Sequence, residues 1–295
     1  MKDPIKAHIA VFGTTLFFSI NFSAVKILID KNLIQSYGLN LVRIIVTVLL
    51  LWLLFAFKKE KKSFNKEDYP RLILCSITGI VFNQMIFVKG LSLTTPIHAS
   101  LLMMATPILI MFSAAWLLKE KLSNNKLSGL IFAITGALLL VLYKKQNTYA
   151  ANTILGDLYV LLNAISYTIY FIMVKPLMNR YSTIMIIRML FTIGLFIALP
   201  FCVTQFIQIP WHNYTLTDYG LLSLVAVGGT FLAYTLNIYA INIIGASKTG
   251  SYIYLQPFLA TVIAVILGKD ILEPYKILAA AFIFLGLYLI NKTSK

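Results

Sequence analysis

The sequence predicts an all-α integral membrane protein, in which ten transmembrane helices form two inverted five-helix repeats. Composition predicts the membrane, because hydrophobic residues make up 59% of the 295 residues, charged residues only 12%, and the mean hydropathy is +0.85. A soluble domain carries roughly a quarter charged residues, so a chain this apolar could not cover itself with polar surface in water. Internal repetition predicts the two repeats: ATPILIMFSAAWLLKEKL begins at Ala105 and LQPFLATVIAVILGKDIL at Leu255.

Charge clusters and turn residues divide the chain into ten apolar stretches. About 20 mostly apolar residues cross a bilayer, and lipid satisfies no free backbone N–H or C=O, so each stretch is expected to be a helix. The first stretch follows Lys2 and Lys6, and we interpret it as a retained helix rather than a cleaved signal peptide. The predicted spans are 5–28, 38–57, 71–90, 96–118, 126–143, 153–175, 183–204, 217–241, 246–267 and 275–291.

The net charge of +15 comes from short basic clusters between the apolar stretches, such as the one at 58–62. Clusters of this kind set membrane topology, whereas a nucleic-acid-binding protein would gather them on one folded face. If the N-terminus lies inside, 16 lysines and arginines fall in interior segments and 7 in exterior segments. Both termini are therefore predicted to be cytoplasmic.

A shift of 150 residues aligns the two halves of the chain, 1–147 and 148–295. Each half holds five predicted spans, and because five is odd, the second half must enter the membrane upside down relative to the first. The aligned pairs are Pro107 with Pro257, Lys119 with Lys269, Glu120 with Asp270, Lys126 with Lys276, and Gly136 with Gly286. A second pair of similar segments is Arg43-Ile-Ile-Val-Thr47 and Arg188-Met-Leu-Phe-Thr192.

Each half thus has a proline in its fourth span, a lysine–acid pair where that span ends and a glycine in its fifth span, and the first span runs from Ser19-Ile-Asn-Phe22 to Lys26. In this order and duplication the chain resembles the EamA-type permeases of the drug/metabolite transporter superfamily. It lacks the tryptophan–glycine pair usual in the first helix, with Phe18-Ser19 near its place. The resemblance implies a carrier of the inner (cytoplasmic) membrane, often an exporter, for amino acids, related metabolites or foreign compounds.

Polar and aromatic side chains inside the spans fall at helical spacing, for example Asn163, Tyr167 and Tyr170 on one face. Buried amides and phenols need a partner or water, so facing inward they would form a cavity with aromatic walls and a few hydrogen-bonding groups. The alternative is that they bond helix to helix. The candidate cavity-lining residues are Asn21, Asn83, Gln84, His98, Tyr167, Tyr170, Tyr234, Asn237, Tyr252 and Gln256.

Two further repeated pairs lie inside the spans. Pro107 and Pro257 cannot donate a backbone hydrogen bond, so we expect each to bend its helix near mid-membrane, as a hinge or as a kink that neighbouring helices satisfy. Arg43 and Arg188 lie about five residues inside their helices, where the side chains can snorkel to the surface. The rival interpretation is that they attract an anionic group of a substrate. The pairs Lys119–Glu120 and Lys269–Asp270 are interpreted as helix-end clusters outside the substrate site.

No HExxH, GxSxG, buried carboxylate pair or catalytic Cys–His arrangement is present, so an enzyme is not expected. Cys75 and Cys202 indicate neither a disulfide framework nor a metal site, and no cofactor is predicted. The predicted function is secondary transport of small organic metabolites by alternating access, with substrate and lipid, and not nucleic acid, as partners. Alternatives are a transporter of phosphorylated substrates and a non-transporting scaffold. Monomer and homodimer both remain open.

Overall fold

The computed structural model describes residues 3–56, 63–93, 102–142, 153–266 and 273–292. These residues are helical throughout and contain no strand. In the first half the helices are α1 (Pro4–Asp30), α2 (Ser36–Ala56), η1 (Lys66–Asp68), α3 (Tyr69–Ser76), η2 (Ile77–Val81), α4 (Phe82–Leu93), α6 (Ala105–Leu117) and α7 (Asn124–Leu142).

The second half has a closely similar order of helices. It consists of α8 (Thr153–Val174), η3 (Lys175–Asn179), α9 (Thr183–Ile207), η4 (Trp211–Asn213), α10 (Leu216–Ser223), η5 (Leu224–Leu232), α11 (Ala233–Ile244), α12 (Ala246–Ser251), η6 (Tyr252–Tyr254), α13 (Leu255–Ile266) and α14 (Pro274–Asn291). The segments η2 and η5 are π-helical and stand at corresponding places, within η1–α3–η2–α4 and within α10–η5–α11.

Seven helical segments of the described residues are long and apolar enough to cross a membrane. They coincide with the predicted spans 5–28, 38–57, 71–90, 153–175, 183–204, 217–241 and 275–291. The other three predicted spans contain α6, with 13 residues, α7, and the interrupted run α12–η6–α13. The multi-pass membrane fold is therefore confirmed, whereas the count of ten spans stays a prediction.

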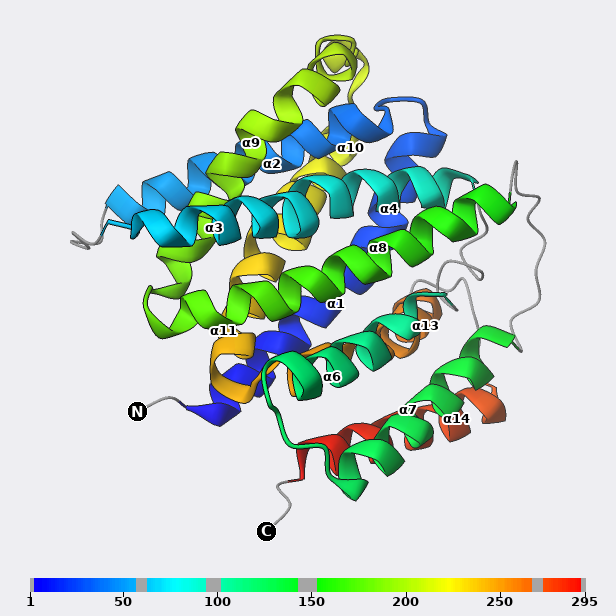
Figure 1. The fold of residues 1–295 in the computed structure, drawn as a ribbon. Coiled ribbons are helices and arrows are strands. Elements are labelled where there is room, and N and C mark those ends of the chain that lie inside the picture. The colour runs from blue at the N-terminus through cyan, green and yellow to red at the C-terminus, as the bar shows by residue number, and fades with distance from the viewer. Residues whose placement is uncertain (1–2, 57–62, 94–101, 143–152, 267–272, 293–295) are drawn as a thin grey trace.

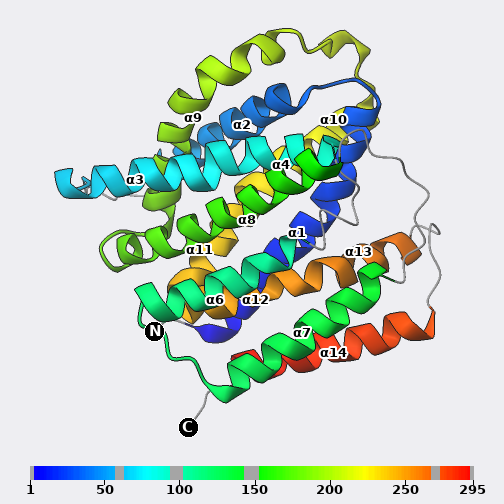
Figure 2. The same ribbon diagram turned by 45° about the vertical axis from the view of Figure 1, so that its right-hand side comes forward.

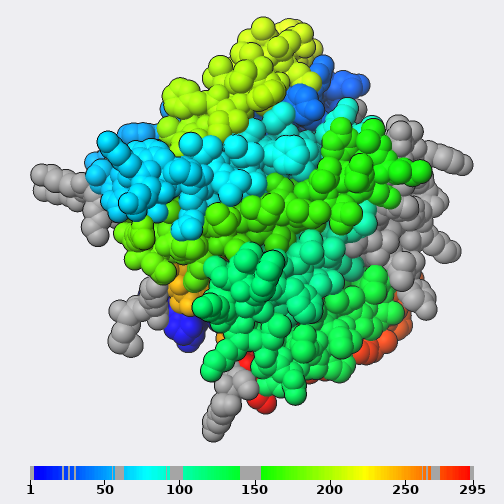
Figure 3. Space-filling model, viewed as in Figure 1, coloured from blue at the N-terminus to red at the C-terminus, as the bar shows by residue number. Residues whose placement is uncertain are grey.

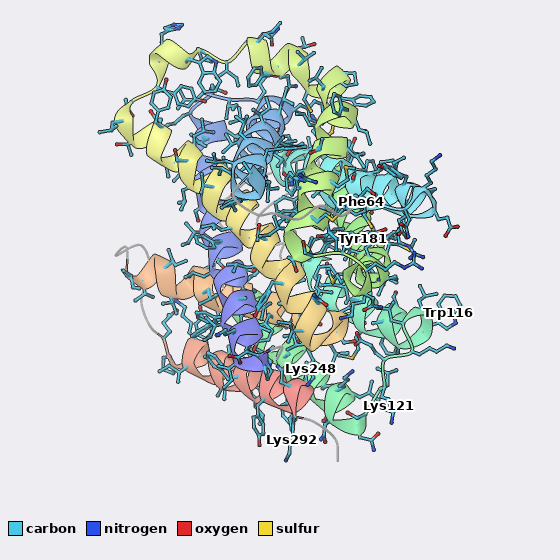
Figure 4. All side chains as sticks on the ribbon, turned by 90° about the vertical axis from the view of Figure 1, so that its left-hand side faces the viewer. Phe64, Trp116, Lys121, Tyr181, Lys248 and Lys292 are labelled. Atoms are coloured by element: carbon cyan, nitrogen blue, oxygen red, sulfur yellow. The ribbon has the colours of Figure 1, made fainter. Side chains whose placement is uncertain are left out.

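Polar and apolar side chains are distributed as a lipid solvent requires. Large apolar side chains lie on the outside, including Trp116 at 82% exposed and Ile154 at 85%, while Asn163 and Asn237 are buried inside. Figure 4 shows Trp116 pointing away from the helices. Exposed apolar side chains are unfavourable in water and favourable in lipid. Amides are buried because lipid offers them no hydrogen-bond partner, whereas the interior of the protein does.

The helices begin where the sequence supplies caps. Asp3 accepts hydrogen bonds from the backbone N–H groups of Ile5 and Lys6 and stands directly before Pro4, which suits a first helical position. Thr215 and Asp218 form a capping box at the start of α10. These polar residues lie at the helix ends, so the interior of each span is free to be apolar.

The helices form a bundle in which α7 and α14 lie side by side at one edge, and α2 and α9 at the opposite edge (Figures 1 and 2). Helices α1, α4, α8 and α11 lie between them, and on one face the side chains of α3, α8, α6 and α7 pack together (Figure 3). At the first edge a Cβ on Gly286 would lie 2.5 Å from the Gly129 carbonyl oxygen, and one on Gly136 2.5 Å from the Ala279 carbonyl oxygen. The later residue of α7 contacts the earlier residue of α14, so the two helices are antiparallel.

Candidate functional site

A polar cavity of about 70 Å³ lies inside the bundle, between the two halves of the chain. Its lining mixes an arginine, five amides, four aromatic rings and two aliphatic side chains. Those residues are Phe18, Asn21, Arg43, Asn83, Gln84, Phe87, Met103, Asn163, Tyr167, Tyr234, Ile253 and Gln256. Ligand pockets commonly measure about 300–1,000 Å³, so the walls of this cavity must part before a metabolite can enter.

Six of the ten predicted cavity residues line this space, and they come from α1, α4, α8, α11 and α13. They are Asn21, Asn83, Gln84, Tyr167, Tyr234 and Gln256. The structure therefore brings together side chains that are far apart in the sequence. Whether they bind a substrate stays a prediction.

Three predicted residues do not line the cavity. Tyr170 is fully buried against Gly79, and Asn237 supports the wall by donating from its Nδ2 to the Tyr167 hydroxyl at 2.8 Å. Tyr252 lies instead in a groove beside α1 and α14, where its hydroxyl is 2.8 Å from Nδ1 of His8. The fourth residue, His98, lies outside the described residues.

Two larger hollows, of about 430 and 630 Å³, lie on the outside of the helices. The larger one is bordered by apolar side chains that are themselves exposed, such as Ile5 and Ile9 at its rim. Such a groove faces the region that lipid occupies. Its size therefore does not make it the better candidate site, and the cavity inside the bundle, with its arginine and amides, is the stronger one.

Arg43 corrects one expectation from the sequence. Its side chain does not snorkel to the surface, because the residue is only 4% exposed and its Nε donates to Oγ1 of Thr230 at 2.8 Å. The Thr230 hydroxyl can accept this bond because it donates its own proton to the Val225 carbonyl, five residues earlier in the π-helix η5. The irregular turn thus fixes the arginine within the cavity wall.

Arg188 lies elsewhere, although the sequence pairs it with Arg43. Its guanidinium carbon is 4.4 Å from the ring centre of Trp52, a half-exposed residue whose indole N–H donates to Thr192. A cation over an aromatic ring is stabilised by the ring's negative face. The two arginines therefore do not form a shared anion site in this structure.

Pro107 and Pro257 both stand third in a helix, in α6 and α13 respectively, and each follows a short irregular stretch whose backbone stays right-handed helical: a turn at Met104 and the 3₁₀ turn η6. A proline cannot donate to the carbonyl of the preceding turn, which suits such an irregularity. Whether the two prolines act as hinges or as tolerated kinks stays a prediction. At these stretches Met103 and Ile253 contribute to the cavity wall, 150 residues apart.

The two π-helices bring reciprocal glycines against the first helix of the opposite half. A Cβ on Gly79 of η2 would collide with the ring of Tyr170, and one on Gly229 of η5 would collide with the side chain of Asn21. Only glycine allows so close an approach. The π-helices therefore set the depth at which α1 and α8 pack, and hence the width of the cavity.

Two amide oxygens in the cavity wall, Oδ1 of Asn21 and Oε1 of Gln84, are buried without a hydrogen-bond donor among the described residues. The Gln84 Nε2 donates to the Tyr234 hydroxyl, which in turn donates to the Gly79 carbonyl. Asn83 and Asn163 differ, since each Nδ2 donates to the other's backbone carbonyl and ties α4 to α8. The unpartnered oxygens are therefore the groups best placed to accept from a bound molecule.

Glu120 was interpreted as part of a helix-end cluster outside the substrate site, and in the structure it lies at the start of a helix of the other half. Its carboxylate accepts from the backbone N–H of Ala246 at 3.0 Å and from the Ser247 hydroxyl at 2.6 Å, and so caps α12 of the second half. Gly245 precedes that cap with φ +88°, a conformation that favours glycine. The equivalent pair Lys269–Asp270 lies outside the described residues.

Sequence reasoning missed Phe18, Phe87, Met103 and Ile253 as cavity residues, because apolar side chains are common in any membrane helix. Internal repetition was the signal that could have found one of them, because Phe18 stands 149 residues before Tyr167, which was predicted. Met103 and Ile253 are equivalent to each other, 150 residues apart, so repetition alone could not single them out. No metal site was expected, and the described residues contain no group of three or more His, Cys, Asp or Glu side chains that could hold a metal ion.

A bundle of membrane-length helices around an internal cavity defines a multi-pass integral membrane protein. Comparison with known families identifies the class further. The profile of the EamA-like transporter family matches residues 5–142 and again residues 154–292. The chain therefore belongs to the EamA-like transporter family and is built from two repeats of it.

Relatives along nearly the whole chain are named as transporters. The chain is 22% identical to the uncharacterized transporter YetK of Bacillus subtilis, over 98% of this chain and 87% of that protein. It is 25% identical to a probable terminal-alkyne amino-acid exporter of Streptantibioticus cattleyicolor, over 97% and 94%. A solved crystal structure shares the fold with a TM-score of 0.78 at 16% identity, covering 96% of this chain and 95% of the other. The general role of this protein is thus transport.

Proposed function

We propose that this protein is a secondary transporter that moves small organic metabolites, such as amino acids or related compounds, across the cytoplasmic membrane by alternating access. The observation that carries the proposal is the internal cavity lined by equivalent residues of both halves, among them Met103 with Ile253 and Gln84 with Tyr234. A site at the interface between two repeats can open to either side as the repeats move against each other. The amino-acid exporter among the relatives supports the substrate class.

The proposal includes two inverted repeats with their boundary between residues 142 and 154, in agreement with halves 1–147 and 148–295. Reciprocal contacts support it. Arg180 pairs with Asp68 at 3.2 Å, and Lys31 pairs with Asp218 at 2.6 Å. The two carboxylates are 150 residues apart in the sequence and the two cations 149. Because α3 and α10 begin at opposite ends of the bundle, the two equivalent ion pairs lie at opposite ends as well (Figures 1 and 2).

Self-reciprocal contacts support a two-fold axis through the cavity. Gln84 donates to Tyr234 across a separation of 150 residues, and the Tyr234 ring lines the cavity. Tyr254 donates to the Met104 carbonyl across the same separation. When a residue of one repeat contacts the residue at the equivalent position of the other repeat, both lie close to the two-fold axis that relates the repeats. A substrate bound there would face both repeats in either orientation of the carrier.

We propose further that both termini are cytoplasmic. Lys121, Lys248 and Lys292 gather at the end of the bundle from which the chain's two ends emerge (Figures 1 and 4). Basic residues favour the cytoplasmic side of a membrane.

The experiment that tests this function is counterflow in proteoliposomes. The purified protein is reconstituted into vesicles loaded with the twenty amino acids, and uptake of each radiolabelled amino acid is measured against protein-free vesicles. A carrier accumulates label transiently above equilibrium, because the unlabelled solute leaves as labelled solute enters. A second panel of nucleosides, polyamines, sugar phosphates and hydrophobic cations tests other metabolites. Absence of counterflow with every compound would contradict the proposed function.

A further inference from the structure

The cavity is lined by one positive charge and, among the described residues, by no carboxylate. Arg43 is 4% exposed, and only its Nε has a hydrogen-bond partner among the described residues, the Thr230 hydroxyl. The two terminal nitrogens of the guanidinium are therefore left to other partners. No carboxylate of the described residues forms an ion pair with Arg43; those of Asp68, Glu120 and Asp218 are each paired at the ends of the bundle. Burying an arginine unpaired is costly, so a site that retains one is suited to receive an anion.

The arrangement around Arg43 favours a planar monoanion. Its bond to Thr230 fixes Nε, so the two terminal nitrogens of the planar guanidinium stay available, and their paired N–H groups match the two oxygens of a carboxylate. A phosphate dianion would need a second positive charge, and Arg188 lies away from the cavity over Trp52. Arg43 is the one cationic residue among the described residues that line the cavity.

The rest of the cavity wall complements the other end of such a molecule. The Asn21 and Gln84 side-chain oxygens are buried acceptors without donors, so they favour a ligand that carries N–H groups. The orientation of the Gln84 amide is fixed, because the Tyr234 hydroxyl gives its only proton to the Gly79 carbonyl and can therefore accept only from Nε2. Rings of Phe18 and Tyr234, 6.1 Å apart and edge to face, add surfaces that attract a cation.

We propose, building on the carrier function above, that Arg43 is the specificity-determining residue that binds the carboxylate of the substrate. Thr230 is its positioning residue, and the Asn21 and Gln84 oxygens receive the hydrogen-bond donors of the substrate's opposite end. The substrate then spans the cavity with its anionic end toward α2 and η5. The carboxylate of a solute therefore contributes more to its selection by the site than its side chain does.

The test uses ligands that differ only in the groups at issue. The twenty amino acids are first screened by the shift in unfolding temperature of the full-length protein in mild detergent. For the tightest binder, dissociation constants are then measured for the amino acid, for the amine that lacks its carboxylate, and for the acid that lacks its amino group. The wild-type protein should bind the amino acid at least about ten times more tightly than the amine, which corresponds to one charge-assisted contact.

Variants separate a binding role from a structural one. In Arg43→Gln the amino acid and the amine should bind alike, whereas Arg43→Lys should keep part of the preference. Arg188→Gln is the matched control, because that arginine lies outside the cavity, and it should keep all of the preference. Thr230→Val should reduce the preference without changing the affinity for the amine. If Arg43→Gln does not fold, Thr230→Val still tests the proposal, since valine retains the shape of threonine and removes only the hydroxyl.

Three results would overturn the proposal: Arg43→Gln retains the preference, wild type binds the amine as tightly as the amino acid, or only sugar phosphates bind. If no amino acid binds but the vesicles carry out counterflow of a solute without a carboxylate, this proposal fails and the carrier function stands. If neither binding nor counterflow is found with any compound, both fail.

Discussion

Helices α7 and α14 approach so closely that a single methyl group should separate them. A Cβ on Gly286 would lie 2.5 Å from both the Ala133 amide nitrogen and the Gly129 carbonyl oxygen. These are backbone atoms, so no side-chain rotation relieves the contact, and one helix must move by about 1 Å to reach ordinary van der Waals distance. Overpacking of this kind costs about 1–3 kcal/mol. We therefore expect Gly286→Ala to lower the free energy of unfolding.

The chain supplies a matched control. Gly220 also lies in a helix, α10, but a Cβ there meets nothing within 4 Å. Alanine in place of a helical glycine gains up to about 1 kcal/mol in helix propensity, and this gain is common to both variants. The difference between Gly286→Ala and Gly220→Ala therefore isolates the packing cost.

The measurement is unfolding in mixed micelles with increasing denaturing detergent, followed by far-ultraviolet circular dichroism. Gly286→Ala should unfold at lower detergent than wild type, and Gly220→Ala at the same or higher detergent. If the two variants unfold together, the close antiparallel contact between α7 and α14 is wrong.

Three further outcomes are expected. Glu120→Ala should leave the backbone N–H groups at the start of α12 without a cap and lower the unfolding temperature. Glu120→Gln should retain part of the cap, so equal unfolding temperatures of the two variants would contradict the capping role. Asp68→Asn should weaken the contact with Arg180 and lower stability more at low than at high salt, because an exposed guanidinium is screened; a salt-independent effect would contradict it. Cys75 and Cys202 are fully buried, so a membrane-permeant maleimide should label them only after unfolding, and mass spectrometry of the folded protein would reveal any exception.

The sequence was sufficient for the membrane fold because composition and helix length are local properties of the chain. Six of the predicted residues line one cavity, since amides and phenols at helical spacing gather on the inner face of a helix surrounded by lipid, and their part in substrate binding stays a prediction. The equivalence of Pro107 and Pro257 was also visible in the sequence. The exact irregularity before each proline was not, because a turn and a 3₁₀ turn depend on how the residues before them pack.

Arg43 and Arg188 show what the sequence could not distinguish. Both lie at similar depth in equivalent helices, and snorkelling was the simpler expectation for both. The difference arises from contacts with distant parts of the chain: Thr230 in the π-helix η5 accepts from Arg43, while Trp52 provides a ring for Arg188. Neither partner can be read from the local sequence, because a π-helix has no strong local signature.

The sequence contains a signal for the two reciprocal ion pairs that the sequence analysis did not use. Asp68-Tyr69 and Asp218-Tyr219 repeat at the same separation of 150 residues as the prolines. The repetition alone does not name the partners of the two acids. Only the structure joins them to Arg180 and Lys31, which lie at the ends of other helices.

The account depends most directly on a cavity that opens to each side of the membrane in turn. A single reporter at Ile253 tests this: Ile253→Cys introduces a thiol into the cavity wall, while Cys75 and Cys202 stay buried. Its labelling by a membrane-impermeant maleimide is compared in intact cells and in inside-out vesicles, with and without the solute identified by counterflow. We predict labelling from both sides and protection by the solute on both sides. Labelling from one side only, under every condition, would contradict alternating access.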